Sequence, residues 1–270
     1  MTRPLAKLQG LKQRLIHSLI CLHMCLIACL LAPSMALADT LNVAVAANFK
    51  ATLQALKPAF EKQTGHHLNI IASGTGHLSN QILNGAPFDV FLAANVHHPK
   101  QIFSQVKETR QLSPQALSIY AHGRLVLLGA HPLPQDSLIK LLQDSSFSKI
   151  ALANSKLAPY GLAAQQTLKH IKLDKRWQGK IIRGQNVAQV YQFIHTGNVA
   201  AGFVSYSLVQ HLPSNRFMEV PAQYYQAIKQ MALRLNNKEI SFAFMTFLTS
   251  PVAKNIIVQK GYTLPVVDTP

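Results

Sequence analysis

Residues 41–49 read LNVAVAANF and residues 68–76 read LNIIASGTG, and these two stretches decide how the chain folds. Each begins as an apolar run of strand length and ends in a turn of small and polar residues. A helical pattern follows each turn, over residues 49–62 in the first case and 77–83 in the second. Two such turns, in neighbouring strand–helix units, can face one ligand.

The two turns place Asn48 and Thr75 at the starts of their helices. The first backbone N–H groups of a helix lack intrahelical partners, and the helix dipole makes this end positive. Small residues there let an anion approach the backbone, while Asn and Thr add side-chain donors. Both residue types are also common helix caps, and capping can coexist with anion binding. The paired arrangement therefore favours an oxyanion site.

Residues 1–38 have the pattern of a secretory signal peptide. The first part is basic without an acidic residue, residues 15–31 are mostly apolar, and the small residues 36–38 precede Asp39. We expect cleavage before Asp39 and a periplasmic location. One alternative is an uncleaved membrane anchor, since the apolar stretch approaches spanning length. Another is a lipoprotein anchored through Cys29, although the residues after Cys29 stay apolar.

The chain has three cysteines, and all of them lie in this leader: Cys21, Cys25 and Cys29. The mature chain is therefore expected to have no disulfide, thiolate nucleophile or cysteine-bound metal. Cleavage leaves about 230 residues, enough for a large core or for two lobes around a cleft. The formal charge of the whole chain is +16, but the cations are dispersed and do not alternate with aromatics. We therefore expect a solvated basic surface and no nucleic-acid partner.

Strand-like and helix-like segments alternate after the leader, which predicts an α/β fold with mainly parallel sheets. The expected strands are residues 42–46, 68–72, 90–93, 125–129, 150–153, 181–183 and 200–205. The expected helices are residues 51–62, 78–83, 100–107, 138–142, 161–170, 187–195, 241–249 and 253–260. Pro251 fits a break or a first-turn position between the last two helices.

Two tracts predict crossings between lobes. Residues 120–124 precede an apolar strand, and residues 202–206 end another strand about eighty residues later. We expect lobe I to contain residues 39–121 and 207–270, and lobe II to contain residues 122–206. A two-segment hinge of this kind suits closure on a ligand.

Several of these segments also carry a family resemblance. Asn48 after its strand, residues 73–76, QILNGAPFDVF at 81–91, APYG at 158–161 and GFV at 202–204 occur in order along the mature chain. Together they resemble the periplasmic molybdate-binding component of ABC transporters. The resemblance implies a two-lobed type II periplasmic-binding-protein fold. It also implies a monomeric, non-catalytic receptor without cofactor, which binds molybdate or tungstate and delivers it to a membrane permease.

In that family neutral donors hold the oxyanion, and molybdenum has no direct protein ligand. The resemblance implies Asn48 as the ligand of the first turn, with the backbone of Ala47 as a weaker contact. It implies the Thr75 hydroxyl in the second turn, and the backbones of Tyr160 and Val187 at two further helix starts.

The chain departs from the family pattern in two places. Many members have a ligand-binding tyrosine where this chain has Ser205. A subgroup instead uses a tyrosine just before the first strand of the second lobe, and Tyr120 fits that position. We expect the phenolic donor to be Tyr120, with Ser205 and Tyr206 as weaker options. In addition, residues 93–95 read AAN where family members commonly have Ser-Ala-Asp. This departure argues against a role for position 95 and does not change the residues expected to bind the ligand.

Donor chemistry bears on the choice of anion. Molybdate, tungstate and sulfate are fully deprotonated near neutral pH and only accept hydrogen bonds, whereas a protonated phosphate also needs an acceptor. Neither turn contains a carboxylate, so phosphate is disfavoured. A receptor for sulfate, thiosulfate or an organic anion remains an alternative.

Other kinds of site have weaker support. The adjacent pairs His66–His67 and His97–His98 point apart on a helix or strand and chelate one ion poorly. Asp89 is expected to be a structural carboxylate at a strand start. A secreted α/β hydrolase is the alternative from another class, but the sequence lacks a Gly-x-Ser-x-Gly nucleophile elbow.

Overall fold

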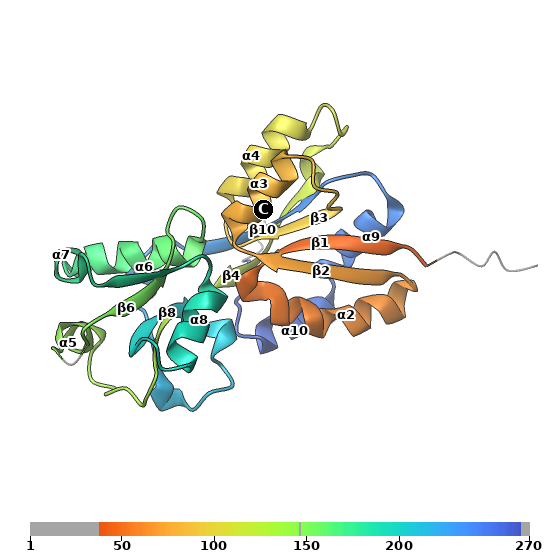
Figure 1. The fold of residues 1–270 in the computed structure, drawn as a ribbon. Helices are drawn as coiled ribbons and strands as arrows, with labels where there is room; N and C mark the ends of the chain where they lie inside the picture. Colours follow the sequence, from red (N-terminus) through yellow and green to blue (C-terminus); the bar gives the residue numbers. More distant parts are fainter. Residues whose placement is uncertain (1–37, 146, 266–270) are drawn as a thin grey trace, which may run out of the picture. The chain divides into compact units, whose positions relative to one another are not determined.

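The computed structural model describes residues 38–145 and 147–265, and from Asp39 onward these residues belong to one compact unit. The expected signal peptide, its expected cleavage site and Cys29 therefore lie outside the described part, apart from Ala38 and Asp39. Within that part the chain forms two five-stranded sheets (Figure 1).

The first sheet has the strand order β2-β1-β3-β10-β4. Its strands are β1 (Thr40–Ala46), β2 (His67–Ser73), β3 (Val90–Ala93), β4 (Leu117–Gly123) and β10 (Ile228–Arg234). β1 pairs in parallel with β2 and β3, whereas β10 pairs antiparallel with β3 and β4. The parallel strands β1 and β2 both end at the turns that carry Asn48 and Thr75.

Helices cover both faces of this sheet (Figure 1). One face packs against α2 (Lys50–Thr64), α9 (Glu239–Leu248) and α10 (Pro251–Gln259), and the other against α3 (Thr75–Leu83) and α4 (His97–Val106). In the first layer Phe60 packs edge-on against Phe244 and Phe247, with ring centroids 5.4 and 5.5 Å away. We call this sheet with its five helices lobe I.

The second sheet has the strand order β7-β6-β8-β5-β9. Its strands are β5 (Leu125–Gly129), β6 (Ile150–Ala153), β7 (Ile181–Gly184), β8 (Ala201–Ser205) and β9 (Phe217–Glu219). Around it lie α5 (Leu138–Gln143), α6 (Pro159–His170), α7 (Asp174–Trp177) and α8 (Val187–His195). These elements share one hydrophobic cluster, which includes Trp177 and Phe203. We call this sheet with its four helices lobe II.

Short 3-10 turns complete the described part of the chain. They are η1 (Ala47–Phe49), η2 (Pro114–Ala116), η3 (Tyr206–Leu208), η4 (Ser214–Arg216) and η5 (Ala222–Tyr224).

The α/β architecture expected from the sequence is confirmed, and three strands and helix α8 have the expected bounds. Both sheets, however, are mixed and not mainly parallel, because β5 and β10 enter their sheets from the opposite lobe and run antiparallel to their neighbours. β4, β9 and β10 were not expected from the sequence. Pro251 occupies the first turn of α10, as expected.

The chain crosses between the lobes at two places. The first crossing is at Arg124, between β4 and β5, close to the expected boundary after residue 121. The return was expected after residue 206, but β9 still belongs to the second sheet, so the chain returns to lobe I between residues 220 and 227. Val209 and Val220 explain the difference, because both are buried in the hydrophobic cluster of lobe II.

Asp89 is a structural carboxylate, as expected. Its oxygens accept hydrogen bonds from the backbone N–H of Asn42 at 2.7 Å and from Asn236 Nδ2 at 2.7 Å. Lys238 Nζ lies 2.9 Å away and forms an ion pair with it. These contacts fix the start of β3 to β1 and to the segment after β10.

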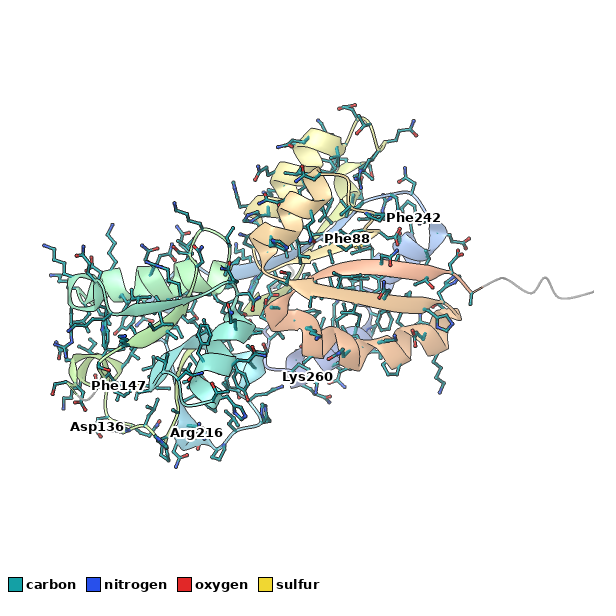
Figure 2. The ribbon with its side chains drawn as sticks, in the orientation of Figure 1. Phe88, Asp136, Phe147, Arg216, Phe242 and Lys260 are labelled. Carbon is teal, nitrogen blue, oxygen red and sulfur yellow. The ribbon has the colours of Figure 1, made fainter. Side chains whose placement is uncertain are left out.

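The surface of lobe I carries one large exposed aromatic ring, that of Phe242 on α9 (Figure 2). The guanidinium of Arg234 lies 3.8 Å from its ring centroid, a cation–π contact. Among the described residues no single helix is long and apolar enough to cross a membrane. α9 and α10 meet the length and composition criteria only as a pair bent by 58°.

Candidate oxyanion site

A small cavity of about 10 Å³ lies where the β1 turn of lobe I meets three helix starts. Its walls come from both lobes. The described residues that line it include no charged side chain and no histidine: Ala46, Ala47, Asn48, Gly74, Thr75, Ala94, Ala158, Pro159, Tyr160, Asn186 and Val187.

Three helices point their N-termini at this cavity. Thr75 is the first residue of α3, Tyr160 the second of α6 and Val187 the first of α8. The backbone N–H groups in these positions cannot have intrahelical partners, and the positive ends of three dipoles add together. The arrangement can hold a small anion by backbone donors alone.

Thr75 is 1% exposed, and its hydroxyl has a defined hydrogen-bond direction. Its Oγ1 accepts a hydrogen bond from the backbone N–H of Ala94 at 3.1 Å. Since this bond uses the oxygen as acceptor, the hydroxyl proton stays available for a ligand in the cavity. A role of Thr75 as a donor to an anion is compatible with this geometry and stays a prediction.

Asn48 lines the cavity, and its side-chain amide is already hydrogen-bonded within the protein. Its Nδ2 donates to Gln230 Oε1 at 3.0 Å and to the Tyr262 hydroxyl at 3.0 Å. The Tyr262 hydroxyl in turn donates to the backbone carbonyl of Asn48 at 2.8 Å. Both amide protons of Asn48 thus fix the turn, and what Asn48 can offer an anion is its backbone N–H.

Lobe II supplies the opposite wall through the starts of α6 and α8. Gly161 lets α6 approach β6 closely, because a Cβ at this position would lie 2.2 Å from the carbonyl oxygen of Ala153. The Asn186 side chain caps α8 by accepting from the N–H groups of Ala188 and Gln189, at 3.0 and 3.1 Å. The Asn186 side chain does not accept from the N–H of Val187, so this N–H can donate into the cavity.

The two lobes touch directly beside the cavity. The backbone N–H of Gly76 donates to the carbonyl oxygen of Leu157 at 2.9 Å. A Cβ at position 76 would lie 3.0 Å from Leu157 Cα, and one at position 74 would lie 3.2 Å from the Gln185 carbonyl oxygen. Glycine at 74 and 76 therefore permits this close approach.

The structure brings together Ala47, Asn48, Thr75, Tyr160 and Val187 of the residues expected to bind the ligand. Their roles as ligand contacts stay predictions.

Tyr120, Ser205 and Tyr206 are not among the residues that line the cavity. The Tyr120 hydroxyl donates to Gln230 Oε1 at 3.0 Å, and Ser205 Oγ lies 2.7 Å from Ser207 Oγ. Tyr206 lies under the guanidinium of Arg124, which is 4.1 Å from its ring centroid. Each of these residues thus has a partner within the protein, and a ligand role for Tyr120 also stays a prediction.

Burial keeps the hydroxyl groups of three tyrosines in and beside the cavity protonated. It raises the pKa of Tyr120 and of Tyr160 well above the usual value, and it raises the pKa of Tyr262. All three therefore remain hydrogen-bond donors at neutral and mildly alkaline pH.

Sequence reasoning missed Gln230 and Tyr262, the two partners of the Asn48 amide. Gln230 is 0% exposed in β10, and Tyr262 is 3% exposed just after α10. The only signal for Gln230 is its position as a polar residue directly before the apolar run Met231–Leu233.

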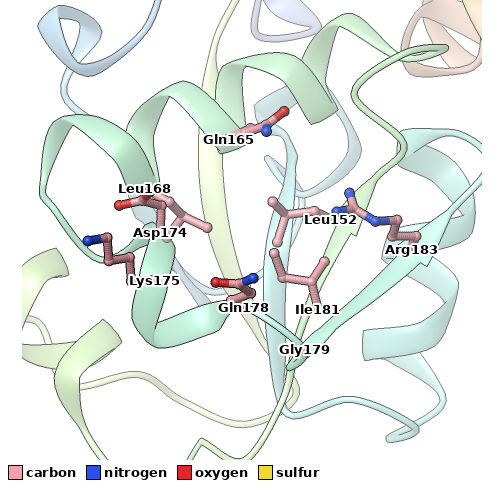
Figure 3. A pocket seen from close by; sticks show the side chains of 9 residues that line it. All are labelled: Leu152, Gln165, Leu168, Asp174, Lys175, Gln178, Gly179, Ile181 and Arg183. Atoms are coloured by element: carbon pink, nitrogen blue, oxygen red, sulfur yellow. The ribbon is translucent and has the colours of Figure 1, made fainter.

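A larger pocket lies in lobe II, between α6, α7 and β7 (Figure 3). Its apolar floor contains Leu152 and Ile181, and its rim combines Asp174 with Lys175 and Arg183. The start of the short helix α7 also lines it, and the first residue of that helix, Asp174, is acidic. Elsewhere in the described part of the chain, no three His, Cys, Asp or Glu side chains come together as metal ligands.

Comparisons with known proteins show the family of the chain. The family described as bacterial extracellular solute-binding protein matches residues 41–263. The molybdate-binding protein ModA of Azotobacter vinelandii is 37% identical over 235 residues, which cover 85% of this chain and 92% of that protein. The molybdate-binding protein ModA of Rhodobacter capsulatus is 34% identical over 230 residues, covering 84% and 89%.

A solved structure shows the same fold. The periplasmic molybdate-binding protein of Azotobacter vinelandii superposes with a TM-score of 0.76 at 32% identity, covering 83% of this chain and 99% of that one. The expected type II periplasmic-binding-protein fold is thereby confirmed. This chain belongs to the family of bacterial extracellular solute-binding proteins.

Proposed function

We propose that this protein is the molybdate-binding component of an ABC transporter, which captures the oxyanion outside the cytoplasm and delivers it to a membrane permease. One observation carries the proposal: the starts of α3, α6 and α8 converge on a small cavity whose described lining has no charged side chain. Relatives at 37% and 34% identity are molybdate-binding proteins, which supports the choice of anion.

The donors of this cavity suit a fully deprotonated dianion. The N–H groups of Thr75, Tyr160 and Val187 and the Thr75 hydroxyl can each donate to an anion oxygen. Hydrogen bonds to a charged group contribute about 1.5–3 kcal/mol each. A set of about five such bonds, with the backbone N–H of Asn48 as the fifth donor, corresponds to roughly micromolar to nanomolar binding after the costs of closure are subtracted.

The same chemistry disfavours phosphate. A protonated phosphate needs an acceptor for its proton, and the Thr75 oxygen already accepts from Ala94. Sulfate and tungstate present the same acceptor-only surface as molybdate. Tungstate is expected to bind as a second ligand, and discrimination against sulfate is expected to depend on the size of the cavity.

The site supports binding and not catalysis. The partner of the Thr75 hydroxyl is a backbone N–H, whereas an activated nucleophile needs a neighbouring base. We infer that the protein is a monomeric receptor without cofactor, exported by its signal peptide to the periplasm.

Calorimetric titration of the purified protein with molybdate, tungstate, sulfate and phosphate tests the proposal. Molybdate and tungstate are expected to bind most tightly, and at about 100 times the dissociation constant each stabilises the fold by roughly 2.7 kcal/mol. Tighter binding of sulfate than of molybdate would overturn the choice of anion. Hydrolysis of a chromogenic ester would instead favour an enzyme.

A further inference from the structure

Gln230 occupies an unusual position between the two segments that connect the lobes. β4 leads to the first crossing, β10 follows the second, and these two strands are paired antiparallel. The register shifts between Gln230 and Met231, which pair with Ala121 and Ile119, so Tyr120 is the extra residue of a β-bulge. A bulge re-aims the side chains next to it.

The bulge brings three polar side chains onto the amide of Gln230. Its Oε1 accepts from Asn48 Nδ2 and from the Tyr120 hydroxyl, both at 3.0 Å. Its Nε2 donates to the Tyr160 hydroxyl at 3.3 Å. Asn48 and Tyr120 belong to lobe I, whereas Tyr160 is at the start of α6 in lobe II. One buried amide therefore joins the ligand-binding turn of one lobe to a ligand-binding helix start of the other.

Gly123 leaves the room that this arrangement needs. A Cβ at position 123 would lie 2.1 Å from the Tyr160 hydroxyl oxygen and 3.1 Å from Gln230 Nε2. The Tyr160 hydroxyl thus occupies the space of a missing side chain at the end of β4, next to the first crossing.

We propose that Gln230 is a positioning residue that fastens the Asn48 turn to helix α6 and thereby slows the release of the bound oxyanion. This inference rests on the proposed function, because it concerns the same cavity. Gln230 itself does not line the cavity. Its effect reaches the ligand through Asn48, whose turn lies on one side, and through Tyr160, whose backbone N–H lies on the other.

The test measures association and dissociation rates of molybdate by stopped flow for the full-length protein and two variants. Gln230→Met keeps the length of the side chain and removes all three hydrogen bonds, so dissociation is expected to accelerate about ten-fold or more. Tyr160→Phe removes only one hydroxyl, and an acceleration of about two- to ten-fold is expected. Association is expected to change less than dissociation in both. Gln143→Met at the end of α5 and Tyr191→Phe on α8, both away from the two crossings, are matched controls with unchanged rates.

A double-mutant cycle separates positioning from a general loss of stability. If Gln230 acts through Tyr160, the effect of Gln230→Met on dissociation is smaller in the Tyr160→Phe background than in the unaltered chain. Equal dissociation rates in Gln230→Met and the unaltered chain would overturn the inference and leave the proposed function intact. Should Gln230→Met not fold, an unchanged dissociation rate in Tyr160→Phe overturns it. Failure of the unaltered chain to bind any of the four oxyanions would overturn both.

Discussion

The backbone N–H of Ala94 donates a hydrogen bond to the hydroxyl oxygen of Thr75 at 3.1 Å, and this bond turns the hydroxyl into a donor toward the cavity. Thr75→Val keeps the shape and removes the hydroxyl, so molybdate affinity is expected to fall about 10- to 100-fold, the loss of one charge-assisted hydrogen bond. Calorimetric titration measures the change. Thr75→Ser keeps the hydroxyl and is expected to bind within a few-fold of the unaltered chain; equal affinity of the Val variant would show that the hydroxyl does not touch the ligand.

Asn48→Asp is expected to weaken both the fold and the binding of molybdate. The substitution keeps the size of the side chain but removes the two protons donated to Gln230 and Tyr262, and it places a negative charge beside an anion site. A buried group without its partner costs about 1–3 kcal/mol of the free energy of unfolding. Urea unfolding and titration calorimetry measure the two effects.

Asn69→Asp is the matched control for Asn48→Asp, because Asn69 is exposed on β2 and donates only to Asn42 at 2.8 Å. Asn69→Asp is expected to leave the free energy of unfolding and the molybdate affinity nearly unchanged. Identical behaviour of the two variants would mean that the Asn48 amide has no special part in the turn.

Gly76→Ala is expected to weaken molybdate binding more than it changes the unfolding of the ligand-free chain. The added Cβ would lie 3.0 Å from Leu157 Cα, where backbone cannot easily move, and it would push α3 away from lobe II. Thermal unfolding without ligand and calorimetry with ligand separate the two effects. An unaltered affinity would indicate that the Gly76–Leu157 contact is not needed when the ligand is bound.

The free energy of unfolding is expected to fall as the pH rises above about 10. Burial raises the pKa values of Tyr120, Tyr160 and Tyr262, so these side chains stay protonated in the folded chain while the unfolded chain loses their protons. The stabilisation is therefore fully present below the unfolded pKa and is lost above it. Urea unfolding between about pH 8 and 11 checks this. Tyr120→Phe is expected to reduce the dependence of the free energy of unfolding on pH in this range. A free energy of unfolding that does not change with pH in the unaltered chain would contradict the prediction.

The lobe I half of the site could be predicted from local sequence, because Asn48 and Thr75 stand directly after apolar strands and before helices. Most helices and three strand bounds followed from hydrophobic pattern in the same way. β10 could not be predicted, since the polar residues Lys229 and Gln230 break its pattern. The return crossing was misplaced because nothing local indicates that the short strand β9 belongs to the second sheet.

The groups behind the cavity depend on contacts that no local pattern reveals. Gln230 and Tyr262 meet Asn48 across 182 and 214 residues of sequence. The bulge that turns Tyr120 toward Gln230 depends on the pairing of β4, which precedes the first crossing between lobes, with β10, which follows the second. For the same reason no local pattern indicates that the Tyr120 hydroxyl has a partner inside the protein.

The bond between Asn48 and Tyr262 also sets an order of events during synthesis. A ribosome makes the turn at residues 46–49 among the first parts of the folded domain, yet its last partner arrives with residue 262, near the end of the chain. Thr263 then pairs with His122 at the edge of β4. A nascent or truncated chain that stops at α10 would have the strands and helices of lobe I but an incomplete turn. Competence to bind is therefore expected only after Tyr262 has been made, and loss of the last few described residues is expected to remove it.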